Sequence, residues 1–228
     1  MKSAWPLFAG VLLCMCAVAG VWVRGQTPAG KYHAAGIAQA GDIGYPVNAK
    51  TPGFVILDVN VDANGALQNI TVVHDLPPFT AGVENAVQSW QFTPALLDGQ
   101  GVPGTLRVCV VFNPYNPSGV GLPGLSLPPT SGIATAQGKF QPVGLTQASY
   151  AKYPPNTVAS GTVVLQVHVG KGGEVHGVVA VRGKGVLIGA ATTAVKSWSF
   201  TPAMYKEKAA PADVVAAFVF ASPEMGTQ

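Results

Sequence analysis

The chain has 228 residues, of which 48% are hydrophobic and 10% are charged. Chains that stay disordered combine low hydrophobicity with high net charge, so this composition predicts a folded protein. The net charge of +3, from 13 Lys and Arg against 10 Asp and Glu, falls far short of a clustered basic surface. Because nucleic-acid binding requires such a surface, we expect no nucleic-acid partner.

Residues 1–25 are predicted to direct export. After Lys2, residues 4–23 form an apolar run without charge. Ala17 and Ala19 supply the small-x-small pattern of a signal-peptidase site, which indicates a cleaved signal. About 20 apolar residues also suffice to span a bilayer, so an uncleaved membrane anchor is the alternative. Membrane contact is expected only through this segment, and only if it is uncleaved.

The three cysteines are divided between this segment and the remainder of the chain. Cys14 and Cys16 lie in the export segment, and Cys109 is the third. A single cysteine cannot form an internal disulfide, so the exported part depends on its apolar cores for stability. Cys109 has apolar neighbours in the sequence and is predicted to pack within a strand.

The chain contains an internal repeat at a single fixed offset, the one that places Tyr45 on Tyr153. The clearest match pairs Ser-Trp-Gln-Phe-Thr-Pro-Ala at 89–95 with Ser-Trp-Ser-Phe-Thr-Pro-Ala at 197–203. Without any gap, 21 of 68 aligned positions are identical, which is more than chance gives at one offset. We therefore predict two copies of one module, at residues 45–113 and 153–221.

The segments outside the two modules are predicted to be connections. Residues 26–44 form a short spacer after the export segment. Residues 114–152 are rich in Pro and Gly and are predicted to be a linker that lets the modules move relative to each other. Residues 222–228 form a tail.

Each module begins with a pattern typical of a β-hairpin. Apolar and polar residues alternate over 54–61, which predicts a half-buried strand. A turn at Gly65 and a second strand at 70–73 follow. The second copy repeats the alternation over 163–169 and places Gly173 in the turn.

The period then changes to that of a helix. Apolar residues recur at i, i+3, i+4 and i+7 over 83–90, and again over 191–198. Thr80 is a candidate N-cap. Six side chains at the end of the helix and just beyond it are expected in the core: Trp90, Phe92, Pro94, Trp198, Phe200 and Pro202.

A third strand completes each module, at 105–112 and 214–220. The order strand, strand, helix, strand predicts an α+β fold. An antiparallel sheet of three strands with a helix across one face is the simplest arrangement that buries both apolar surfaces. We expect two such modules in tandem.

These motifs resemble the TonB C-terminal domain family. The resemblance rests on Tyr-Pro at the start of each module, the alternating first strand, the Ala-Val-x-Ser-Trp-x-Phe-Thr-Pro-Ala signature and a closing Val-Phe strand. It implies a periplasmic location, either free or anchored in the inner membrane. It also implies main-chain recognition, in which an extended peptide adds to a sheet edge.

The resemblance leads to two functional hypotheses. The first is a periplasmic adaptor or scaffold that binds extended segments of envelope proteins. The alternative is an anchored energy transducer that couples proton-motive force to outer-membrane transporters. For the first hypothesis, the expected edge is the third strand of each copy, with these side chains: Leu106, Val108, Val110, Phe112, Val214, Ala216, Phe218 and Phe220.

Enzymatic and metal-dependent functions are not expected. No acid, base or nucleophile occurs in both copies, and no cofactor motif is present. His168 and His176 flank the second hairpin, but the first copy has Asn60 and Gln68 at the equivalent positions. Because a metal site needs more ligands than these, we expect none.

The two copies differ in the sign of their charge. Residues 45–113 contain two basic and five acidic residues, whereas residues 153–221 contain six basic and three acidic residues. Opposite net charges of −3 and +3 favour either contact between the modules or different partners for each.

Overall fold

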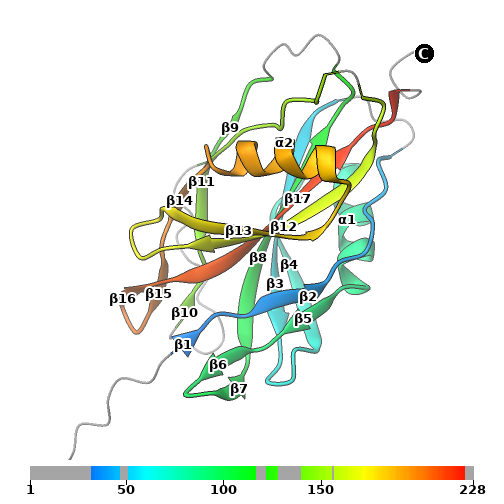
Figure 1. Ribbon diagram of the computed structural model, residues 1–228. Helices are drawn as coiled ribbons and strands as arrows, with labels where there is room; N and C mark the ends of the chain where they lie inside the picture. Colours follow the sequence, from blue (N-terminus) through cyan, green and yellow to red (C-terminus); the bar gives the residue numbers. More distant parts are fainter. Residues whose placement is uncertain (1–31, 47–50, 117–121, 128–139, 156, 224–228) are drawn as a thin grey trace, which may run out of the picture. The chain divides into compact units, whose positions relative to one another are not determined.

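Figure 1 shows the computed structural model of the chain. It describes residues 32–46, 51–116, 122–127, 140–155 and 157–223. Within these residues, no helix has the length and hydropathy needed to cross a membrane. The export segment predicted at residues 1–25 lies outside the described residues, so signal and anchor remain alternative predictions.

The fold is α+β, with mostly strands and two helices. Six long strands form its centre: β3 (Gly53–Val61), β4 (Leu67–His74), β8 (Gly104–Asn113), β12 (Gly161–Val169), β13 (Val175–Arg182) and β17 (Ala212–Phe220). The helices are α1 (Phe79–Gln88) and α2 (Gly185–Val195). In each copy, two long strands precede the helix and one follows it.

Short strands extend this framework on both sides of each helix. After the helices come β5 (Gln91–Thr93), β6 (Ala95–Leu97), β7 (Gln100–Val102), β14 (Ser199–Thr201), β15 (Ala203–Tyr205) and β16 (Lys208–Ala210). Before the first long strand of each copy come β1 (Tyr32–His33), β2 (Gly36–Gln39), β9 (Leu125–Ser126), β10 (Phe140–Gln141) and β11 (Gly144–Ala148).

The six long strands form one continuous sheet, not two separate sheets. Their order is β13-β12-β17-β8-β3-β4. The third strands of the two copies, β8 and β17, lie side by side at the centre and pair in parallel, from Arg107 opposite Val214 to Asn113 opposite Phe220. The modules therefore contact each other through a shared sheet. This arrangement does not agree with the expectation that the modules move relative to each other.

The two helices lie on opposite faces of this sheet, and each face has its own core (Figure 1). The core under α1 contains Trp90, Phe92 and the even-numbered side chains of β8 from Leu106 to Phe112. The core under α2 contains Trp198 and Phe200, together with Val214, Ala216, Phe218 and Phe220. Both Trp side chains are 5% exposed, while Pro94 and Pro202 are half-buried.

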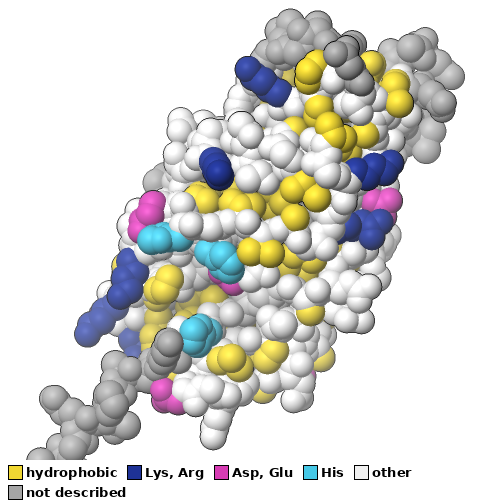
Figure 2. All heavy atoms as spheres, viewed as in Figure 1, with side chains coloured by type: hydrophobic (Ala, Val, Ile, Leu, Met, Phe, Trp, Pro, Cys, Tyr) yellow, Lys and Arg dark blue, Asp and Glu magenta, His cyan; other side chains and the backbone are white. Residues whose placement is uncertain are grey.

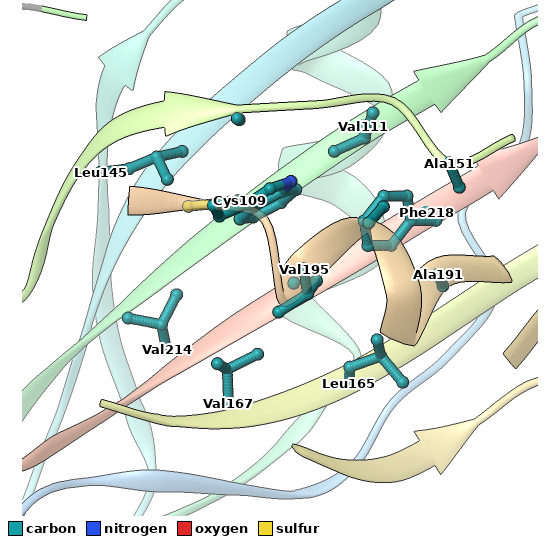
Figure 3. Close-up of a cluster of buried hydrophobic side chains, with 14 of the residues drawn as sticks. Cys109, Val111, Leu145, Ala151, Leu165, Val167, Ala191, Val195, Val214 and Phe218 are labelled. Atoms are coloured by element: carbon teal, nitrogen blue, oxygen red, sulfur yellow. The ribbon is translucent and has the colours of Figure 1, made fainter. Parts of the chain in front are cut away.

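Each copy also contributes to the core of the other, because the central strands are buried on both faces. Cys109 and Val111 of β8 project into the core under α2, beside Phe218 (Figure 3). Val215 and Val219 of β17 project into the core under α1. A strand covered on both faces is typical of a sheet with a layer on each side.

The predicted spacer and linker contain folded segments that pack against the two modules. Ile37 and Ile43 lie in the core under α1, and the Thr162 hydroxyl accepts a hydrogen bond from the Ile43 N–H at 2.9 Å. Leu145 lies in the core under α2, with Phe54 of the first copy (Figure 3). The strand before each module thus covers the sheet face that the other module leaves open.

Both hairpin turns require glycine. Gly65 has φ +85° and Gly173 has φ +89°, which is the left-handed region. A Cβ at either position would also lie 2.5 Å or less from a carbonyl oxygen, that of Phe92 or of Phe200. The turn is therefore fixed by backbone packing as well as by φ.

Thr80 is not the N-cap of α1, contrary to the sequence prediction. The helix begins at Phe79, and Pro78 at the N-cap makes no side-chain hydrogen bond. The Thr80 hydroxyl instead accepts a hydrogen bond from the Leu76 N–H at 2.9 Å. It fixes the loop before the helix.

A buried ion pair joins β3 and β8. The Arg107 guanidinium donates from Nε and Nη2 to the two carboxylate oxygens of Asp58, each at 2.8 Å. Burial opposes the charge of Arg107, but these hydrogen bonds and the Asp58 charge outweigh it and raise the pKa of the guanidinium. Asp58 and Arg107 lie on the same sheet face as Ile56 and Cys109, which belong to the core under α2.

Candidate functional site

The structure places the predicted binding strands in the middle of the sheet. The backbone of β8 pairs with β3 on one side and with β17 on the other. The backbone of β17 likewise pairs with β12 and β8. Neither third strand is a sheet edge, so neither is open to an added peptide in this structure. The alternation correctly placed their side chains, but it carried no information about the partner strand.

The outer edges of the sheet are the second strands, β4 and β13. Among the described residues, each of these strands pairs on one side only. Two valines are exposed along them, Val72 on β4 at 37% and Val179 on β13 at 53%. These strands therefore carry the unpaired backbone groups that strand addition uses.

The surface around β13 is the more apolar of the two edges. Val186, in the first turn of α2, is 49% exposed, and Val158, just before β12, is 76% exposed. Figure 2 shows hydrophobic side chains over the part of the surface that α2 and β13 occupy. Of the four large hydrophobic residues that are exposed in the described chain, three belong to the second copy.

The two edges have opposite charge. Lys171 lies in the turn before β13, and Arg182 and Lys184 lie at and just beyond its end. The equivalent strand β4 is flanked by Asp62 and Asp75. The charge difference between the copies is therefore present at the ends of the two edge strands, which is consistent with different partners.

A cavity of about 650 Å³ lies beside the second hairpin. Its lining includes three histidines, His33 of β1, His168 of β12 and His176 of β13. Figure 2 shows His side chains gathered on this face next to acidic ones. Asp213 Oδ1 is 2.5 Å from His168 Nδ1, and Glu174 Oε1 is 2.7 Å from His176 Nε2.

The expectation about metal was based on two of these histidines, and the third was missed. In the described part of the chain, no group of three or more His, Cys, Asp or Glu residues is arranged to hold a metal ion. His33 was not expected near the other two because its segment was predicted to be a spacer. The structure brings it to the cavity through the pairing of β1 with β6 and the passage of β2 across the second copy.

Comparison with models of protein families identifies the family of this chain. The model described as the Gram-negative bacterial TonB protein C-terminal matches twice, at residues 45–114 and at residues 149–221. The chain belongs to this TonB C-terminal family. No curated protein and no solved structure matches it.

Membership of the TonB C-terminal family sets the general function. The family consists of periplasmic, non-enzymatic domains of Gram-negative bacteria that interact with outer-membrane proteins. The chain contains two tandem copies of the domain. At the level of the family, the chain is therefore a TonB-like protein of the cell envelope that interacts with a protein partner there.

The repeat extends upstream of the two predicted modules. The offset that relates the two copies also pairs Gly36 with Gly144, Gln39 with Gln147, and Ala40 with Ala148. The same offset relates β2 to β11. This match was the available signal that residues before each Tyr-Pro pair belong to the fold.

Proposed function

We propose that this TonB-like protein binds extended peptide segments of envelope proteins by strand addition at β13, and acts as a periplasmic adaptor or scaffold. The observation that carries the proposal is the position of β13. It is an outer strand of a continuous six-stranded sheet, and Val179 on it is 53% exposed. An added strand would receive main-chain hydrogen bonds from β13 and apolar contact from its exposed side chains.

Two features of the surface favour β13 over β4. Exposed Val158 and Val186 extend the apolar area near β13. Lys171, Arg182 and Lys184 outnumber Glu174 at its two ends and give them a net positive charge, although Arg182 lies 4.0 Å from Asp42. The partner segment is therefore expected to be apolar in its centre and acidic at its ends, because charge complementarity favours encounter and register.

The scaffold role is supported by how the two copies are joined. The parallel β8–β17 pairing and the exchanged core contributions make them one folded unit. Such a unit holds its two edges, β4 and β13, at a fixed separation. It would present two binding edges of opposite charge on one platform.

Strand addition can be tested by proline substitution at the edge. Val179 and Ala180 are neighbours on β13, so the backbone N–H of one points outward and that of the other toward β12. The variants V179P and A180P, compared with T71P and V72P at the equivalent positions of β4, form matched pairs. Capture of a partner from envelope extract should be lost in the β13 variant that keeps the wild-type circular dichroism spectrum.

The β4 variants control for nonspecific effects of proline on the fold. Capture of the same partner should persist in T71P or V72P. Equal capture by folded β13 variants would remove β13 as the site. Equal loss in both pairs would show that the binding does not distinguish the edges, and would also contradict the proposal.

The second candidate is the anchored energy transducer, which the apolar run at residues 4–23 favours. N-terminal sequencing of the exported protein separates it from the adaptor. A mature start near Gly20 or Gln26 supports a free adaptor. An intact N-terminus with Lys2 supports an anchored protein.

A further inference from the structure

The cavity beside the second hairpin concentrates the histidines of the chain. Of the four histidines in the sequence, three line this one cavity. They come from distant segments, since His33 lies on β1 ahead of the first module and His168 and His176 belong to the second module. Three histidines from distant segments therefore face the same cavity.

The repeat supplies an internal control that separates binding from folding. At the offset between the copies, Gln141 corresponds to His33, Asn60 to His168, and Gln68 to His176. The other charged members of the cavity are also replaced, since Lys171 corresponds to Ala63, Glu174 to Ala66 and Asp213 to Thr105. The fold forms with uncharged residues at all six positions, so it does not require the histidines.

The hydrogen bonds orient two of the imidazole rings. Asp213 accepts from His168 Nδ1–H and also from Gln166 Nε2–H, both at 2.5 Å. Glu174 accepts from the Nε2–H of His176 at 2.7 Å. Because a carboxylate only accepts, the proton of each neutral ring is held on the bonded nitrogen, and the other nitrogen carries a lone pair.

Protonation changes the hydrogen-bonding capacity of these imidazole rings. Once a ring is charged, its second nitrogen becomes an N–H donor, while the carboxylate bond is kept. Histidine is the side chain that gains its charge between about pH 8 and pH 5. His168 and His176 then become donors on both ring nitrogens, joined by His33 and the Lys171 ammonium on the cavity lining.

Protonation of the histidines would change the sign of the cavity charge. Its charged and titratable lining groups are Lys171, Glu174, Asp213, the three histidines and Tyr32. With neutral imidazoles the net charge is −1, and with three imidazolium ions it is +2. Hydrogen bonds to its own backbone N–H and to His176 lower the pKa of Glu174, so this carboxylate stays ionised in mild acid. Tyr32 stays neutral, because burial raises its pKa.

We propose that this cavity binds a small oxyanion, a carboxylate or a tetrahedral phosphate- or sulfate-like group, when its histidines are protonated. The donor-rich, cationic form matches an acceptor-rich anion. The absence of a three-ligand metal arrangement among the described residues, and the presence of Lys171, favour an anion over a metal ion. The site lies beside the proposed peptide edge and does not depend on strand addition.

The test uses the full exported protein and inorganic sulfate, whose charge does not change in the relevant range. Sulfate is titrated at about pH 5.5 and about pH 8.0 at constant ionic strength, and the imidazole proton resonances are followed by NMR. We expect binding at least about tenfold tighter at the lower pH, from several added charges near the ligand. Succinate in a parallel titration decides between a carboxylate and a tetrahedral anion.

The variants use residues that the other copy already holds. The triple variant H33Q/H168N/H176Q should lose the low-pH binding, and H74Q, at the fourth histidine, should retain it. Equal affinity at both pH values, or unchanged binding by the triple variant, would overturn the proposal. So would Zn²⁺ binding at about pH 8.0 without sulfate binding at about pH 5.5. None of these outcomes affects the test of β13.

Discussion

Leu145 gives the sharpest test of how the predicted linker contributes to the fold. Its side chain is 1% exposed and lies in the core under α2 (Figure 3). The variant L145A removes three buried carbon atoms. At about 0.8 kcal/mol for each, the lost transfer free energy is about 2.4 kcal/mol, and the residual cavity raises the total to about 3–5 kcal/mol. A residue in a solvated linker would change the free energy of unfolding by less than about 0.5 kcal/mol.

Urea unfolding followed by circular dichroism measures this difference, provided that the slope of the transition is unchanged. The matched control is Q147A, two residues further along β11, because Gln147 is exposed. We expect it to stay within about 0.5 kcal/mol of wild type. If L145A were as stable as Q147A, β11 would not be part of the core, and the linker interpretation would be restored.

Three further predictions follow from the buried groups and the turns. Burial raises the pKa of the Cys109 thiol to about 12, so iodoacetamide at about pH 8 should not alkylate it in the folded protein. Peptide mass spectrometry should find it alkylated only after denaturation. Labelling of the native protein would contradict this prediction. The variant G173A should lose at least about 2 kcal/mol in urea unfolding, because φ is +89° and a carbonyl oxygen of β14 is too close, whereas G189A, in open space on α2, should gain about 0.5–1 kcal/mol. The variant D58N should lose about 3–5 kcal/mol by removing the carboxylate that Arg107 faces, and the double variant D58L/R107M should lose less than the sum of D58L and R107M. Additive losses would show that the two side chains do not act as a pair.

The sequence predicted the long strands and helices because each has a local period. Alternation at 54–61 and 163–169 marked β3 and β12, and the i, i+3, i+4 pattern marked the helices. The Gly turns were also local signals. The prediction that Thr80 is the N-cap was wrong, because its hydroxyl accepts a hydrogen bond from the Leu76 N–H in the preceding loop.

The arrangement of the two copies could not be predicted in the same way. The β8–β17 pairing joins strands from different copies, far apart in the sequence, and periodicity within one module says nothing about it. One signal was available, since residues 106–112 and 214–220 are almost continuously apolar. Such runs are typical of strands buried on both faces, not of a binding edge. The third strands were predicted to be sheet edges because each module was considered without the other.

Only part of the histidine cavity could be predicted from the sequence. His168 and His176 were recognisable as neighbours across the hairpin, but His33 reaches them only through the path of β1 and β2. A comparison of the two copies, position by position, could have indicated the site. Titratable residues in the second hairpin replace uncharged residues at the equivalent positions of the first.

Hydrogen exchange of the backbone amides tests the central claim most directly, namely that β8 and β17 are the paired centre of one sheet. The amides of both strands should exchange only on global unfolding, and should be the slowest in the protein. The amides of β4 and β13 that point away from the sheet should exchange much faster. If half of the β8 and β17 amides exchanged as fast as those of β4 and β13, the two copies would be separate modules with open third strands.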